Sequence, residues 1–114
     1  MKENKLVDFS IDFAVKIIKI CGNIKGHYSI NNQLERSGTS VGANIREAFY
    51  AHSKADFIAK LQIALKECSE SEYWLELLYK TNYIGEEQYN SLEIKCKSLR
   101  AMLVASINTA KNNK

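Results

Sequence analysis

The sequence predicts an all-α protein: an antiparallel up-down-up-down four-helix bundle, in one domain over residues 1–114. Proline is absent and only 5 of the 114 residues are glycine, which favours long helices over a turn-rich sheet. Hydrophobic residues make up 46% of the chain, and they recur at helical spacing in four segments. The connections between these segments are short, so consecutive helices should run in opposite directions around one core.

The first segment predicts a helix over residues 5–24. Its main apolar residues recur every three or four positions, as expected for one buried face: Leu6, Phe9, Phe13, Ile17, Ile20 and Ile24. A second apolar band lies beside this face: Val7, Ile11, Ala14 and Ile18. Gly22 and Gly26 bracket the end of the helix, and residues 27–32 should form a loop.

The second helix is expected over residues 31–52, and the rest of the chain should be organised around it. Its stretch 33–48 reads Q-L-E-R-S-G-T-S-V-G-A-N-I-R-E-A, with small residues crowded in the middle. Such a run forms a poor isolated helix, because each glycine costs roughly 1 kcal/mol relative to alanine. Leu34, Val41 and Ile45 nevertheless share one face. We therefore expect a central helix that neighbouring helices approach closely from several sides.

Polar and glycine positions within this stretch have simple interpretations. Gly38 and Gly42 form a G-x-x-x-G pattern, but the surrounding chain is not apolar enough for a membrane dimer. No lysine follows as in a phosphate-binding loop. Asn44 lies at the edge of the apolar face, where we expect a hydrogen-bonded polar group of the bundle rather than a ligand contact.

The third helix is expected over residues 54–80, with Ser53 and Asp56 as an approximate capping box. Its core face should contain Phe57, Leu61, Ala64, Leu65, Cys68, Leu75, Leu78 and Tyr79. An outer band is formed by Ile63, Tyr73, Trp74 and Leu77. We expect this band to meet another subunit, the alternative being scattered surface aromatics. Glu67, Glu70 and Glu76 should form a solvated or inter-subunit face.

The fourth helix is expected over residues 86–110, after a short turn. Its inner face contains Tyr89, Leu92, Cys96, Leu99, Leu103, Ile107 and Ala110. Arg100 projects close to this face, and an unpaired buried guanidinium is very costly. It should therefore pair with a carboxylate such as Glu47 or Glu72, or lie at a subunit boundary.

Composition argues against a metal site, a cofactor, a membrane span and catalysis. The three cysteines, Cys21, Cys68 and Cys96, lie far apart without a C-x-x-C pair, so buried free thiols in a reducing compartment are expected. His27 and His52 supply neither paired zinc ligands nor a catalytic triad, and the bundle metal motif Glu-x-x-His is missing. No apolar run approaches the roughly 18 residues of a membrane span. We expect a cytoplasmic, non-enzymatic protein.

The formal net charge of +3 is unevenly distributed along the chain. Residues 1–66 carry a net charge of +4, residues 67–94 carry −6 and residues 95–114 carry +5. Unlike surfaces of this kind favour a head-to-tail contact between copies, which closes into a ring where the rotation permits. The candidates for phosphate contacts are Lys16, Lys19, Lys25, Arg36, Arg46, Lys95 and Lys97, the alternative being an ordinary solvated face.

The stretch 33–48 resembles the hallmark of the 23S rRNA intervening-sequence protein family, also called the S23 or four-helix-bundle protein family. The residues that carry the resemblance are Gln33, Arg36, Ser37, Ser40, Asn44, Ile45 and Glu47, with Gly38 and Gly42 between them. The third helix is also similar, in its S-x-x-x-F at residues 53–57 and in residues 64–75. Many members have Phe-Pro before the second helix and Glu-Gly at its end, where this chain has residues 25–28 and Glu47-Ala48.

The resemblance implies a homopentameric ring of four-helix bundles in a bacterial cytoplasm. Some members are encoded inside intervening sequences of 23S rRNA genes, and a related accessory protein associates with a reverse transcriptase and with nucleic acid. For this chain we therefore expect an oligomer that binds RNA or DNA through basic surface patches. The alternative is a protein-protein assembly or adaptor module without nucleic-acid binding.

Overall fold

The computed structural model describes residues 4–113 and contains four α-helices. They are α1 (Lys5–Asn23), α2 (Tyr28–Ala48), α3 (Lys54–Lys80) and α4 (Glu86–Asn112). No strand occurs within the described part of the chain, which confirms the all-α prediction. None of these helices combines the length and the apolarity needed to cross a bilayer, within residues 4–113.

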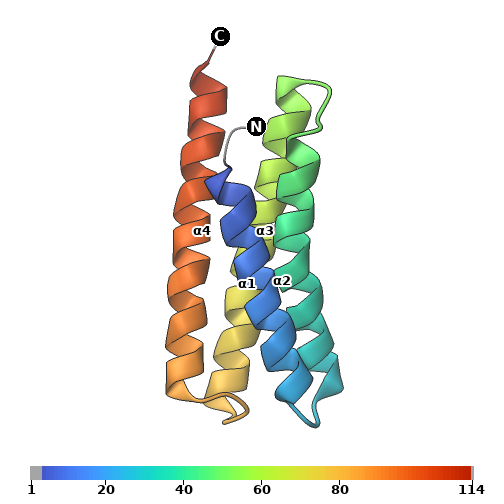
Figure 1. Ribbon diagram of the computed structural model, residues 1–114, viewed down its shortest axis with the longest axis vertical. Helices are drawn as coiled ribbons and strands as arrows, with labels where there is room; N and C mark the ends of the chain where they lie inside the picture. The colour runs from blue at the N-terminus through green and yellow to red at the C-terminus, as the bar shows by residue number, and fades with distance from the viewer. Residues whose placement is uncertain (1–3, 114) are drawn as a thin grey trace.

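The helices lie side by side along the long axis of the molecule (Figure 1). The α1–α2 and α3–α4 connections lie at one end, and the α2–α3 connection lies at the other (Figure 1). His27 and Tyr83, from the first two of these connections, meet edge to face with ring centroids 4.8 Å apart. Each helix packs against two others, α1 against α2 and α4, and α3 against α2 and α4. Neighbouring helices therefore approach α2 from two sides, as expected, but α2 is no more central than α3.

The boundaries of α2 differ from the expected residues 31–52. The helix begins at Tyr28, because Gly26 and His27 have positive φ angles of 88° and 43° and turn the chain within a short loop. It ends at Ala48, and the residues after it tighten into a turn in which Tyr50 N–H donates to the Glu47 carbonyl. Ser53 then caps α3 as expected, accepting a 3.0 Å hydrogen bond from the Asp56 N–H.

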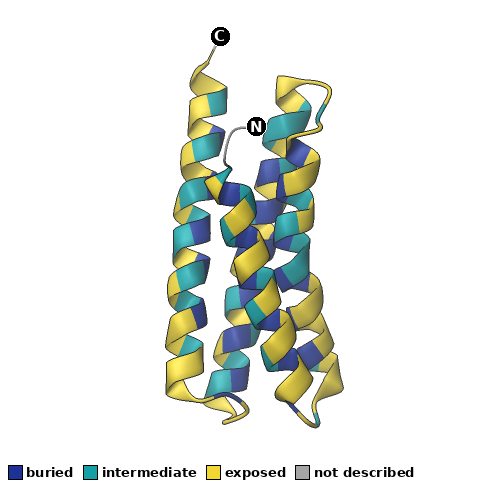
Figure 2. Cartoon of the chain, in the orientation of Figure 1, coloured by how far each residue is buried: buried dark blue, intermediate teal, exposed yellow. Residues whose placement is uncertain are grey.

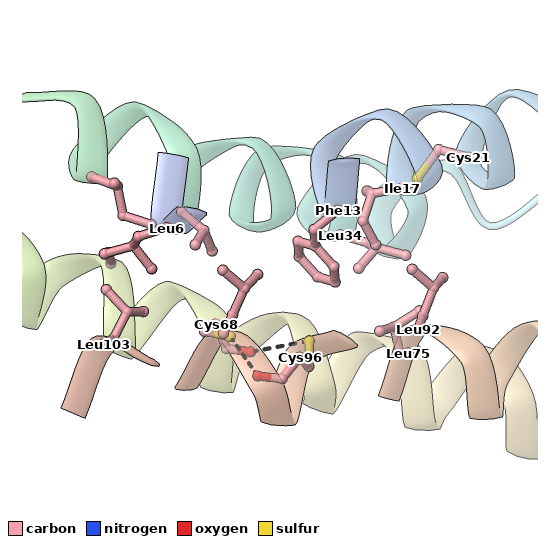
Figure 3. Close-up of a cluster of buried hydrophobic side chains, with 14 of the residues drawn as sticks. Leu6, Phe13, Ile17, Cys21, Leu34, Cys68, Leu75, Leu92, Cys96 and Leu103 are labelled. Atoms are coloured by element: carbon pink, nitrogen blue, oxygen red, sulfur yellow. Dashed lines mark hydrogen bonds between the residues drawn. The ribbon is translucent and has the colours of Figure 1, made fainter. Parts of the chain in front are cut away.

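The core lies between the four helices, which turn their buried faces inward (Figure 2). Figure 3 shows side chains from every helix meeting there, including Phe13, Leu34, Leu75 and Leu92. Nearly all of the expected core residues are buried or half-buried against this cluster. The core faces predicted from helical spacing are thus confirmed.

The three cysteines are free and buried, as expected. Cys68 on α3 and Cys96 on α4 lie side by side, and the Cys68 Sγ is 3.4 Å from the Cys96 carbonyl oxygen (Figure 3). The hydrogen bond with Cys68, together with burial, raises the pKa of the Cys96 thiol. Burial raises the pKa of Cys21 to about 11. Cys21 and Cys96 are therefore neutral packing groups near neutral pH, whereas the hydrogen bond with Cys96 lowers the pKa of Cys68.

The two glycines of the G-x-x-x-G pattern form the contact between α2 and α1. A Cβ atom placed on Gly38 would lie 2.9 Å from Cγ2 of Ile17, a side chain that is fully buried. One turn later, a Cβ atom on Gly42 would lie 3.1 Å from the Ser10 Oγ. The missing side chains therefore let the two helices approach, and dense packing offsets the weak helix propensity of the run.

Candidate functional site

An ionic cluster links α2 to α3. On α2 it contains Gln33 and Arg36, two of the residues that carry the family resemblance. The Arg36 guanidinium pairs with Glu67 at 3.2 Å and also with Glu70. The Trp74 indole N–H donates to the same Glu70 carboxylate at 3.2 Å, and this bond, followed by Arg36, lowers the pKa of Glu70. Gln33 accepts a hydrogen bond from the Arg36 Nε at 3.4 Å. We call these residues the Arg36 cluster.

This cluster corrects the expectation for the acidic residues of α3. Glu67 is buried, with 8% of its surface exposed, and does not lie on a solvated face. Arg36, expected as a phosphate contact, is instead held by two carboxylates of its own chain. Helical spacing along α3 indicated neither the burial of Glu67 nor the cation that neutralises it.

Small polar residues complete the contact between α2 and α3. The Oγ atoms of Ser37 and Ser71, both fully buried, are 2.9 Å apart, so one hydroxyl donates to the other. At the far end of α2, Glu47 pairs with Lys60 at 3.1 Å, which raises the pKa of Lys60. Asn44 donates to the Ser40 carbonyl at 2.9 Å, as expected for a polar group of the bundle. Arg36, Ser37 and Glu47 thus hold α2 against α3.

Arg100 pairs with Glu72, one of the two carboxylates expected for it. The pair links α4 to α3 near the Cys68–Cys96 contact. Partial burial raises the pKa of Glu72, although the Arg100 charge acts in the opposite direction. The half-buried Arg100 cation is thereby neutralised within the chain, without need of a subunit boundary.

The seven basic residues expected to bind phosphate do not form one patch. Lys16 and Lys19 line a shallow hollow between α1 and the start of α4, beside Glu87. Lys25 is exposed in the α1–α2 loop at the same end. Arg46 is exposed near the opposite end, on the last turn of α2.

The remaining cations are engaged within the chain. Lys95 lies 2.9 Å from Asp12, whose pKa this contact lowers, and its Nζ is 5.2 Å from the centre of the Phe9 ring. Lys97 pairs with Glu93 at 3.3 Å along α4. Within residues 4–113, no carboxylate forms an ion pair with Lys16, Lys19, Lys25 or Arg46.

The outer band predicted on α3 is only partly exposed. Ile63 and Tyr73 expose 40% and 55% of their surface. Trp74 and Leu77 are half-buried, and the Trp74 ring packs edge to face on Tyr73 with centroids 5.0 Å apart. We call Ile63, Tyr73, Trp74 and Leu77 the α3 band.

A longer apolar surface lies on the other side of the molecule, between α1 and α2. Ile11, Val15 and Ile18 on α1 each expose between 43% and 48% of their surface, although such residues are usually buried. They border an open groove whose α2 side consists of Thr39, Gly42, Ala43 and Arg46. We call it the α1–α2 groove. The second apolar band of the first helix, with Ile11 and Ile18, is the sequence signal of this surface. The sequence predicts an interface only for the α3 band.

Metal-ligating side chains do not converge in the described part of the chain. Residues 4–113 contain no group of three or more His, Cys, Asp or Glu side chains that could hold a metal ion. His27 contacts Tyr83 at the loop end, and His52 lies at the α2–α3 connection near the other end. The two imidazoles are too far apart in the fold to act as a pair.

The comparisons with known proteins agree with this architecture. The family model of the 23S rRNA-intervening sequence protein matches residues 2–105. A crystal structure of a protein of unknown function, from the S23 ribosomal protein family of Bacteroides thetaiotaomicron VPI-5482, is 48% identical with a TM-score of 0.85. The match covers 90% of this chain and 97% of that one. No curated protein is similar to the chain. The chain belongs to the 23S rRNA-intervening sequence protein family.

Proposed function

We propose that this protein is a non-enzymatic, antiparallel up-down-up-down four-helix bundle that acts by assembling with copies of itself into a ring. The observation that carries the proposal is the α1–α2 groove. Exposing three β-branched apolar residues along one helix is unfavourable by about 25 cal/mol for each Å² left in water. A contact between subunits removes this surface from water.

The α3 band is the partner surface that we assign to the groove. The groove is bordered by the small residues Gly42 and Ala43, so a bulky side chain can approach the helix backbone. Tyr73 and Trp74 supply bulky aromatic groups. Because groove and band are different surfaces of one chain, the contact is head-to-tail, and repetition of such a contact closes a ring where the rotation between copies permits. We expect five copies, a mass five times the 13.0 kDa of one chain.

Cross-linking between copies tests this assignment. Val15→Cys and Tyr73→Cys place a thiol on each surface, and the three native cysteines are buried, so background reaction should be slow. Under mild oxidation we expect a disulfide-linked dimer when the two variants are mixed, and none with either variant alone. Tyr28→Cys, an exposed residue of α2 outside both surfaces, is the control. A Val15→Cys dimer formed by itself would indicate a two-fold contact and contradict the head-to-tail assignment.

Nucleic-acid binding is the second function that we propose, with cytoplasmic RNA or DNA as ligand. Support comes from Lys16, Lys19, Lys25 and Arg46, which make no ion pair within residues 4–113. A ring would repeat these charges and strengthen a weak contact. Arg36, Lys95 and Lys97 support this function less, since each is paired within the chain. A protein partner such as a reverse transcriptase, or an adaptor role without nucleic acid, is the alternative.

A salt titration distinguishes nucleic-acid binding from an adaptor role without nucleic acid. We expect the protein to bind a structured RNA or a duplex DNA at low salt and to weaken as salt rises, because counterions are released. Lys16→Gln should reduce the slope of the salt dependence by about 1 if that residue contacts a phosphate. Lys80→Gln, at an exposed pair with Glu76, is the control. Absence of binding at low salt would leave assembly alone as the function.

A further inference from the structure

A second hollow lies where α2 turns into α3, and its lining is suited to an unpaired nucleotide. It is lined by Ala43, Arg46, Glu47, Tyr50, His52, Asp56 and Lys60. We propose that this α2–α3 corner binds single-stranded nucleic acid, with a base stacked on Tyr50 and its phosphates near Arg46 and His52. The inference rests on the proposed nucleic-acid function and names a site for it.

Tyr50 is the first observation. It exposes 80% of its surface, more than any other large hydrophobic side chain among the described residues. It lies just after the last turn of α2, in the turn whose hydrogen bonds fix the backbone, so its position does not depend on a long flexible loop. Neighbouring Phe49 packs edge to face on Phe57 of α3, with centroids 5.6 Å apart, and anchors the turn. A fixed, exposed aromatic ring offers a stacking surface that any base can use.

The charges around Tyr50 are the second observation. The corner contains Glu47 as well as cations, but Glu47 is held by Lys60 at 3.1 Å, so that pair is internally neutral. Asp56 lies in the first turn of α3, where the helix dipole stabilises its charge. Arg46 is then the one charged group of the corner, besides Asp56, without an ion pair within residues 4–113, and the exposed His52 lines the same hollow. An exposed aromatic ring beside an arginine is the arrangement that single-strand binding uses.

Duplex nucleic acid does not fit the same arrangement. The bases of a duplex are stacked on each other and paired, so their faces are not available to an exposed tyrosine. The corner is also compact, formed by one helix end and the start of the next. It therefore suits one or two nucleotides of a flexible strand rather than a long double helix.

The test uses a short fluorescein-labelled oligoadenylate, the same strand annealed to its complement, and polyglutamate, with binding followed by anisotropy on the full chain. We expect the single strand to bind more tightly than the duplex, and Tyr50→Ala to weaken it roughly 5-fold to 100-fold, the range for removal of one stacking aromatic. Tyr50→Phe should retain most of the affinity. Arg46→Gln should weaken binding and reduce its salt dependence.

Tyr28→Ala is the matched control, since Tyr28 exposes 66% of its surface but lies at the first turn of α2, at the opposite end of the bundle. Circular dichroism and light scattering on each variant exclude loss of fold or assembly. If Tyr50→Ala binds as the unmodified protein does while Lys16→Gln weakens binding, the corner assignment is wrong and the broader nucleic-acid function stands. If no nucleic acid binds, both are wrong. Equal, Tyr50-dependent binding of polyglutamate would indicate an acidic protein partner and overturn the assignment.

Discussion

The two sides of α2 differ in how completely the chain itself covers them. Toward α3, Ser37 and Ile45 are fully buried, and Arg36 is tied to two carboxylates of that helix. Toward the outside, Thr39, Gly42 and Ala43 border an open groove shared with the exposed apolar stripe of α1. Contact between α2 and α3 is also the most extensive in the molecule.

The run of small residues in α2 therefore has two structural roles. The same lack of bulk that lets α3 and Ile17 pack closely on one part of α2 leaves a shallow surface on another part. The first part stabilises the single chain. The second part is left open by the single chain, and its apolar surface is buried only when another molecule covers it. Substitutions should therefore separate the two sides by what they change.

The largest effect is expected from a cavity on the covered side. Ile45→Ala removes fully buried methyl groups and should lower the free energy of unfolding by about 2–5 kcal/mol. Val15→Ala, on the exposed stripe, should change the free energy of unfolding of the dissociated chain by about 0.5 kcal/mol or less. Urea denaturation of dilute protein measures both. Equal losses would mean that the two sides are not distinct.

The next effect comes from adding a methyl group to each glycine of the G-x-x-x-G pattern. Gly38→Ala places its Cβ 2.9 Å from Ile17, and overpacking should cost about 1–3 kcal/mol. Gly42→Ala places its Cβ 3.1 Å from the Ser10 Oγ, a milder overlap that the gain in helix propensity partly offsets, so the loss should be smaller than for Gly38→Ala. Gly22→Ala, with no atom near its Cβ position, is the control and should gain up to about 1 kcal/mol. Equal melting temperatures for the first two variants would contradict this reading.

A smaller effect is expected from the Arg36 cluster. Arg36→Gln removes the cation from the buried Glu67, and because half of the Arg36 side chain is exposed, the loss should be about 1 kcal/mol. Lys80→Gln breaks the exposed pair with Glu76 and should cost about 0.5 kcal/mol or less. Chemical denaturation of the two variants measures the difference. A cost no larger than that of Lys80→Gln would show that the cluster adds no stability.

The smallest effect concerns pH. The Trp74 N–H and Arg36 hold the pKa of Glu70 below its usual value. Because the folded pKa is the lower one, this contribution is complete above the unfolded pKa and is lost as pH falls through the folded pKa. Trp74→Phe removes the first donor, so its stability should fall less steeply between neutral and acid pH. Unfolding curves at several pH values measure the slope. Parallel profiles for the two proteins would exclude a role of Glu70.

The sequence predicted the helices and their core faces because helical spacing of large apolar residues is a strong signal. It located the four helices and the buried Cys68 and Cys96, and it gave Glu72 as one of two carboxylates for Arg100, with a subunit boundary as the alternative. Spacing says which face is apolar but not which neighbour covers it. For that reason the burial of Glu67 and the exposure of Ile11 and Ile18 were not predicted.

The ends of α2 and the surface sites were harder to predict for a different reason. The start at Tyr28 depends on left-handed backbone at His27, and histidine in a loop gives no signal of it. Seven cations were equivalent in the sequence, and only their neighbours in space separate the paired Lys95 from the unpaired Arg46. Ion pairing between helices is a property of the packed fold, which spacing along one helix does not encode.

Assembly through the α1–α2 groove is tested by the mass of the protein in solution. Light scattering at micromolar concentration measures this mass for the unmodified chain and for Val15→Glu. A charge in the α1–α2 groove lies on a surface that the single chain leaves open, so the variant should fold normally yet lose the contact with its neighbours. We expect a solution mass that is a multiple of 13.0 kDa for the unmodified protein and a mass of 13.0 kDa for Val15→Glu. A mass of 13.0 kDa for the unmodified protein, or an undiminished multiple for the variant, would contradict this expectation.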